Sequence, residues 1–172
     1  RWNQPAHWSL TSGGVNGECP PNPSDNVFFD ANSFVSINDS VVIGATTAYC
    51  KNMDWTGATQ NPFLNGNYSY SLRIFGSLNL APSMTFNLKG DLNFESNLPG
   101  NTIKTNGTFV NANILNFSGT GSWKQNSSLE SHILFQTNGA YSTNNYGLNL
   151  RDLIGRSSAS SLLLGTSIIK SD

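Results

Sequence analysis

Apolar and polar residues alternate along much of the chain, and this alternation predicts short β-strands. Clear runs with a period of two residues are 69–74, 77–80, 85–88 and 91–94. Such runs send one row of side chains into a core and the other toward the surface. No window spaces its apolar residues as a helix does, and Gly and Asn repeatedly interrupt the runs. The sequence therefore predicts an all-β fold.

A recurring pattern indicates that part of the fold is built from repeats. An apolar residue is followed by any three residues, a glycine, any one residue and a second apolar residue. The matches run from Leu72 to Leu78, Phe86 to Leu92, Ile103 to Phe109, Phe117 to Trp123 and Phe135 to Tyr141, with glycines Gly76, Gly90, Gly107, Gly121 and Gly139. We expect both apolar residues of each match to point inward and the glycine between them to form a corner with positive φ.

The glycines also indicate a repeat length. Gly76, Gly107 and Gly139 are almost evenly spaced, and Thr105-Asn106-Gly107 returns as Thr137-Asn138-Gly139. We therefore expect a unit of about 31 residues with two similar halves. A unit this small cannot bury its apolar face alone and must stack on its neighbours. Stacked repeat units predict a parallel β-helix or β-solenoid, and the alternative is a β-sandwich.

The chain is expected to form one continuous domain with two parts. Residues 67–172 carry the solenoid repeats, and residues 1–66 form an irregular N-terminal capping segment with some β-structure. Trp2 and Trp8 are expected to cover the open end of the core, because an indole ring buries a large apolar area. The abrupt start and the strand-like end of the sequence are interpreted as those of a piece of a longer protein.

The chain has two cysteines, Cys19 and Cys50. A disulfide between them would close a loop of about thirty residues and stabilise the fold by roughly 3–4 kcal/mol. We expect this disulfide to form in an oxidising compartment and to clasp the N-terminal end. The alternative is a pair of buried free thiols.

Charged residues are scarce, and this scarcity argues against several classes of function. Charged residues make up 11% of the chain, the formal net charge is −1, and no apolar stretch could span a bilayer. The sequence therefore predicts neither nucleic-acid binding nor membrane insertion. Asp91 and Glu95 would share a strand face, and we interpret them as solvated surface. The basic residues Lys104, Lys124, Arg151 and Arg156 do not form the cluster that a polysaccharide lyase requires.

The sequence predicts no catalytic residue, no enzymatic activity and no cofactor, because it contains no nucleophile motif and no phosphate-binding loop. Calcium is the only metal for which it offers ligands, Asp25 and Asp30, although Asp residues also cap turns without a metal. Trp55 is the candidate for a glycan contact, because a flat ring can stack on a sugar; packing in the core is the alternative.

Several stretches together resemble a known repeat module. They are Arg1-Trp2, His7-Trp8-Ser9, Gly13-Gly14, residues 25–30, residues 117–123 and residues 162–168. The stretches resemble repeat modules of very large secreted proteins of Bacteroidota. The resemblance implies export through the type IX secretion system and display at the cell surface or release from it. It also implies roles in adhesion or gliding motility.

Two main hypotheses about function follow. The first is a non-catalytic segment of a secreted cell-surface adhesin or stalk, whose partners are neighbouring repeats of the same polypeptide, the secretion or outer-membrane machinery, and surface polysaccharide. The alternative is a carbohydrate-binding module of a polysaccharide-degrading protein. A third hypothesis, a β-helical lyase or hydrolase, would require turnover on uronic-acid polymers.

Overall fold

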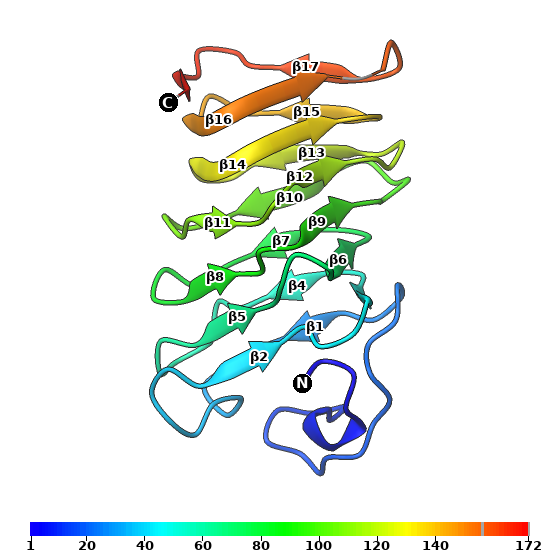
Figure 1. Cartoon of the computed structure of the whole chain (residues 1–172), viewed down its shortest axis with the longest axis vertical. Coiled ribbons are helices and arrows are strands. Elements are labelled where there is room, and N and C mark those ends of the chain that lie inside the picture. The colour runs from blue at the N-terminus through cyan, green and yellow to red at the C-terminus, as the bar shows by residue number, and fades with distance from the viewer. Residues whose placement is uncertain (156, 172) are drawn as a thin grey trace.

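The computed structural model describes residues 1–155 and 157–171 and shows a parallel β-solenoid of about six turns (Figure 1). Its strands stack in parallel from the N-terminal end to the C-terminal end. The predicted β-solenoid is therefore confirmed, and the alternative of a β-sandwich is excluded. Arg156, one of the basic residues considered above, lies outside the described residues.

The elements are short, as the frequent glycines and asparagines predict. Among the described residues, the 3₁₀ helix η1 (Pro5–His7) is the one helical element, and every later element is a strand. The strands are β1 (Val27–Phe28), β2 (Ser40–Val42), β3 (Thr47–Cys50), β4 (Met53–Asp54), β5 (Phe63–Asn65), β6 (Ser71–Ile74), β7 (Leu78–Asn79), β8 (Thr85–Asn87), β9 (Asp91–Phe94), β10 (Asn101–Lys104), β11 (Val110–Asn111), β12 (Leu115–Phe117), β13 (Ser122–Gln125), β14 (Leu129–Gln136), β15 (Ala140–Ser142), β16 (Leu148–Gly155), β17 (Ser161–Leu163) and β18 (Ile169–Ser171).

Each turn of the solenoid contributes to three stacks of strands. Stack A contains β1, β4, β7, β10, β13, β15 and β17. Stack B1 contains β2, β5, β8, β11 and β18, and stack B2 contains β3, β6, β9 and β12. The long strands β14 and β16 run through B1 and B2 and join them into one sheet. The chain therefore passes from B1 to B2 to A in every turn.

The strand register gives the length of a turn. In stack B2, Leu72 pairs with Leu92, Leu92 with Leu115, and Leu115 with Leu134. One turn is therefore much shorter than the unit that the glycine spacing predicted, and that prediction is wrong. Gly107 lies at the corner between stacks A and B1, whereas Gly139 lies at the corner between stacks B2 and A. The two glycines therefore do not occupy equivalent positions, and their spacing is not a repeat length.

The solenoid also begins earlier than the predicted boundary at residue 67. Strands β1 to β5, within residues 27–65, already pair in parallel with later strands of the same stacks. The sequence shows strand-like runs in this region, but the glycine pattern on which the boundary rested has no match within residues 1–66. The buried apolar residues of both parts form one core cluster, as expected for one continuous domain.

Most of the predicted inward residues lie in that core. Leu78, Leu92, Trp123 and Tyr141 are buried, which confirms their predicted orientation. Phe109 is exposed instead, because its neighbours Thr108 and Val110 take the inward positions. Phe135, the first apolar residue of its match, is likewise on the outer side of β14, where Leu134 and Gln136 point inward.

The corner glycines serve two different purposes. Gly107 and Gly139 have positive φ angles of 86° and 65°, which confirms the prediction at these two positions. It is wrong for Gly76, Gly90 and Gly121, whose φ angles are not positive. There glycine allows close approach between turns: a Cβ on Gly90 would overlap the carbonyl oxygens of Tyr70 and Asn67.

Candidate functional site

The two cysteines do not form a disulfide. Cys50 is buried, Cys19 is exposed, and both are free thiols, so the predicted clasp is wrong. Cys50 ends β3 at an inward position of the strand, whereas Cys19 lies in the irregular segment before β1. The two thiols therefore lie in different surroundings, and a disulfide would require at least one of them to move. Burial raises the pKa of the Cys50 thiol far above its usual range.

Trp55 is fully buried, so it offers no surface on which a sugar could stack. Its ring packs against Phe29 at a centroid distance of 4.0 Å and against Phe34 at 5.8 Å. The predicted glycan contact at Trp55 is therefore wrong, and the alternative of core packing is correct. Trp2 and Trp8 pack edge to face 5.0 Å apart beside this cluster, which confirms their expected place at the end of the core.

Asp25 and Asp30 each cap their own turn. Asp25 accepts a hydrogen bond of 2.9 Å from the backbone N–H of Asn22, and Asp30 accepts one of 2.9 Å from Asn32. Hydrogen bonding from Ser12, followed by that from Asn32, lowers the pKa of Asp30. Residues 1–155 and 157–171 contain no group of three or more His, Cys, Asp or Glu side chains that could hold a metal ion. The structure therefore accounts for these carboxylates as caps.

The other charged residues are spread over different faces. Asp91 and Glu95 share the outer face of stack B2, as expected. Asp91 accepts a hydrogen bond from Asn113, and Glu95 lies 3.5 Å from the Arg73 guanidinium. Of the basic residues named in the sequence analysis, Lys104 and Lys124 lie on stack A, and Arg151 lies between the two halves of β16, beside Asp152.

The outer face of stack B1 brings together residues that the repeat pattern did not reveal. Phe63 pairs with Thr85 in the next turn. Val110 pairs with Phe86, so Phe109, the residue before Val110, lies opposite Thr85, the residue before Phe86. The two phenylalanines thus lie in one row, two turns apart, at a spacing of about 9.5 Å. Phe109 is also in edge-to-face contact with His132 at 5.1 Å.

A ladder of asparagines runs beside this row. Asn87 donates to the side-chain oxygen of Asn65 at 3.3 Å, and Asn111 donates to that of Asn87 at 2.8 Å. All three are partly exposed. We call Phe63, Asn65, Asn87, Phe109 and Asn111 the B1 strip. It presents ring surfaces next to amides, a combination that can bind a neutral ligand by stacking and hydrogen bonding.

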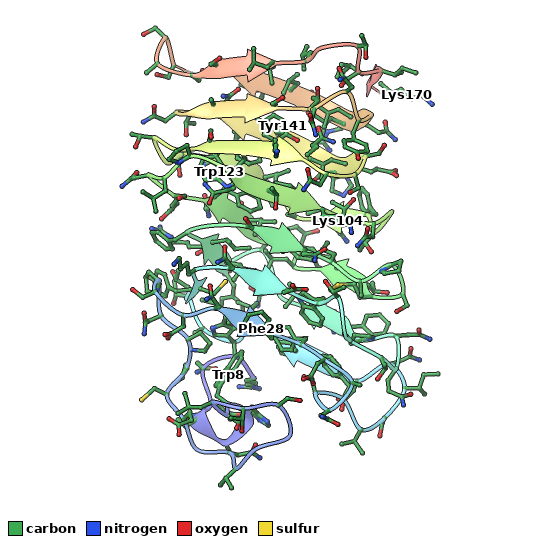
Figure 2. The ribbon with its side chains drawn as sticks, turned by 180° about the vertical axis from the view of Figure 1, so that it is seen from behind. Trp8, Phe28, Lys104, Trp123, Tyr141 and Lys170 are labelled. Carbon is green, nitrogen blue, oxygen red and sulfur yellow. The ribbon has the colours of Figure 1, made fainter. Side chains whose placement is uncertain are left out.

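A groove of about 470 Å³ lies at the corner between stacks A and B1, and its lining includes Thr108, which directly precedes Phe109 of the strip. It is lined by residues from successive turns, including Thr105, Glu130, Asn145 and Lys170. Figure 2 shows Lys170 and Lys104 on the same side of the solenoid. The groove thus adds one carboxylate, one ammonium group and several neutral polar groups to the surface that a ligand on the strip would meet.

A larger hollow of about 960 Å³ lies at the N-terminal end, between the irregular segment and the first turn. Its lining includes Trp8, Phe28 and Asp54, and Figure 2 shows Trp8 and Phe28 at this end of the molecule. The carboxylate of Asp54 is already held by the backbone N–H of Thr56 at 2.7 Å. The B1 strip is therefore the better candidate site, because its three amides form a continuous ladder and its two rings lie in one row, two turns apart.

A sequence signal for the B1 strip does exist. The segments Phe63-Leu64-Asn65, Thr85-Phe86-Asn87 and Phe109-Val110-Asn111 all place Asn two positions after a ring or a threonine. The spacing between successive segments matches one turn of the solenoid, because each segment lies one turn after the last in stack B1. The expectation that Phe109 points inward concealed this signal.

No protein-family model matches the chain, and no curated protein and no solved structure shows significant similarity to it. Among the described residues, no helix has both the length and the hydropathy needed to cross a membrane. The structure thus defines the chain as a parallel β-solenoid.

Proposed function

We propose that the chain is a non-catalytic segment of a secreted cell-surface adhesin or stalk. The observation that carries the proposal is the B1 strip, in which exposed Phe109, partly exposed Phe63 and three partly exposed amides lie along the side of a stack of turns. Such a surface favours many weak neutral contacts spread along a length of chain. This mode of binding suits adhesion to an extended partner, for which surface polysaccharide is the proposed class.

The shape of the solenoid supports the same proposal. Parallel strands stack about 4.8 Å apart, so six turns extend the polypeptide by roughly 30 Å along the solenoid axis. Each turn is stabilised chiefly by its neighbours, so length can grow without a new core. The sequence resemblance to secreted Bacteroidota modules supports export and surface display, with the secretion or outer-membrane machinery as a further partner.

Adhesion can be tested with beads that carry the purified chain on their surface. We expect the beads to attach to polysaccharide-coated surfaces, and we expect attachment to fall at least about tenfold in the double variant Phe63→Ser, Phe109→Ser. The matched control is Phe28→Ser, because Phe28 is an exposed aromatic residue on a different stack. Equal attachment by all three proteins, or no attachment by any, would contradict the proposal.

A carbohydrate-binding module is the second candidate, and the spacing of Phe63 and Phe109 favours it. Two rings about 9.5 Å apart can each stack on one sugar of an extended neutral polysaccharide while Thr85 lies between them. This candidate predicts saturable binding to one soluble polysaccharide. Affinity electrophoresis against a panel of neutral polysaccharides should then show retardation that Phe109→Ala abolishes and Phe28→Ala preserves.

A further inference from the structure

The row of rings in the B1 strip leads to a carboxylate in the next turn. Val110 pairs with Ser131, so Phe109 and Glu130, the residues that precede them, lie opposite each other. Glu130 is exposed and follows Phe109 at about 4.8 Å along the solenoid axis. Every position of the B1 strip itself is uncharged. Glu130 is therefore the first charged side chain that a ligand meets along this row.

The same row continues into the groove at the corner between stacks A and B1. Glu130 pairs with Asn149, and Asn149 pairs with Lys170. All three residues line the groove. The strip and the groove therefore form one surface that runs along the solenoid axis. This surface lies on the side of the stack, where a turn stacked on either end would lengthen it and would not cover it.

The Glu130 carboxylate is available to a ligand. It takes part in no ion pair and no side-chain hydrogen bond with residues 1–155 and 157–171. By contrast, two carboxylates on the outer face of stack B2 already have partners: Asp91 accepts from Asn113, and Glu95 lies beside Arg73. The position of Glu130 is therefore explained neither by a cap nor by an ion pair.

The lysines near this surface lie farther along it or to one side. Lys170 is three turns beyond Phe109 in the same row, and Lys89 is two residues beyond Asn87, at the corner between stacks B1 and B2. Glu130 is only one turn beyond Phe109. Because electrostatic interactions fall with distance and are screened by salt, the negative charge acts most strongly on a sugar next to Phe109.

We propose that Glu130 makes the surface select neutral polysaccharides over polymers of uronic acids. The inference rests on the proposed function, in which the B1 strip binds an extended polysaccharide. An extended pyranose is similar in length to one turn of the solenoid, so the sugar that follows one stacked on Phe109 reaches Glu130. Its hydroxyl groups donate to the carboxylate, and such charge-assisted hydrogen bonds are stronger than neutral ones. A uronic acid at the same place brings two carboxylates together and is repelled.

Affinity electrophoresis tests the inference with hydroxyethyl cellulose, galactomannan and dextran as neutral probes and with polygalacturonate and alginate as anionic probes. Retardation relative to a polymer-free gel gives each affinity, and the preference is the ratio of the best neutral affinity to the best anionic one. The buffer is alkaline, so that a charge on His132, which contacts Phe109, does not offset that of Glu130.

Glu130→Gln keeps the size of the side chain and removes its charge. We expect it to lower the preference for neutral polysaccharide at least about tenfold, because the hydrogen bonds to hydroxyl groups weaken and the repulsion of uronic acids is lost. The matched control is Glu18→Gln, the same substitution at an exposed position of the irregular N-terminal segment. It changes the net charge equally and should leave the preference unchanged.

The possible failures are distinguishable. If no neutral polysaccharide retards the parent chain, the proposed function fails and this inference fails with it. If neutral and anionic polymers retard the parent equally, or if Glu130→Gln keeps the preference of the parent, the inference alone is overturned. An equal fall in preference for Glu18→Gln would also overturn it, because net charge and not the position of Glu130 would then set the preference.

Discussion

The two ends of the solenoid differ more than any two of its turns. At the N-terminal end, an irregular segment places Trp2 and Trp8 over the core, so that Val27 and Ala48 of the first turn are buried and Val41 is partly buried. At the C-terminal end, Leu153 and Leu162 occupy core rows but remain partly in water. Stacking of equivalent turns therefore does not by itself cover the last turn, and a separate, non-repeating segment is needed to bury the end of the core.

The physical reason is that a parallel turn always presents two equivalent faces. Each face carries inward side chains and unpaired backbone groups, and the next turn satisfies both at once. At the N-terminal end the aromatic cluster replaces the side-chain contacts, while the bond from Trp2 to Val42 replaces one backbone contact. Substitutions at the capped end and in the middle should therefore cost more than equivalent substitutions at the open end.

The largest effect is expected at the cap. Trp55→Ala removes a fully buried ring that packs on Phe29 and Phe34, and it should lower the free energy of unfolding by about 3–5 kcal/mol. The control is Phe28→Ala, an exposed ring on β1, which should change stability by less than about 0.5 kcal/mol. Urea denaturation measures both, and similar losses would show that the cluster does not close the core.

A pair of leucines in one row compares the middle with the open end. Leu134→Ala should cost about 2–5 kcal/mol, because its side chain is completely covered by the following turn. Leu153 is its partner one turn later, and Leu153→Ala should cost only about 1 kcal/mol, since part of its side chain stays in water. Urea denaturation at a concentration where the chain is monomeric measures the difference. Equal costs would mean that the open end is covered in solution.

Substitutions of two glycines compare the backbone packing of a central turn with that of the C-terminal end. Gly90→Ala places a methyl group against two carbonyl oxygens of the preceding turn, and we expect a loss of about 1–3 kcal/mol. For Gly155, near the C-terminal end, no atom of the other described residues, its chain neighbours excepted, lies within 4 Å of the position that a Cβ would take. Gly155→Ala should therefore be almost neutral in the same unfolding measurement. A neutral Gly90→Ala would contradict the close approach of turns.

The smallest effect concerns the cysteines, for which the structure predicts no link between the capping segment and the core. A thiol reagent should modify Cys19 alone in the folded chain, and should modify Cys50 as well after denaturation without any reductant. Mass spectrometry counts the modified thiols directly. Detection of a Cys19–Cys50 disulfide in freshly purified, folded protein would restore the clasp that the sequence predicted.

Much of the fold could be predicted from the sequence, because a solenoid repeats its local pattern. The strand alternation, the stacking and the inward Trp123 and Tyr141 follow from periodicity. The true length of a turn is visible in Leu92-Asn93-Phe94 and Leu115-Asn116-Phe117, which lie one turn apart and pair in register. The glycine pattern obscured this signal, because glycine serves several different corners of the solenoid.

The site was harder to predict, because burial depends on contacts distant in the sequence. Trp55 and Phe109 are both aromatic residues near turns, yet Trp55 is covered by Phe29 and Phe34, and Phe109 faces solvent. In a very short strand, a shift of one position reverses which side chain points inward. The cysteine pairing failed for a related reason: sequence separation says nothing about the direction in which a side chain points.

Hydrogen exchange of the dilute, monomeric chain tests the central claim, a solenoid closed at one end, most directly. We predict that the backbone amides of β17 and β18 exchange first, because strands at an uncovered end open without disturbing the rest. The amides of β1 and β4, next to the aromatic cluster, should be protected as well as those of the central turns. Exchange at β1 and β4 before β17 and β18 would contradict the account.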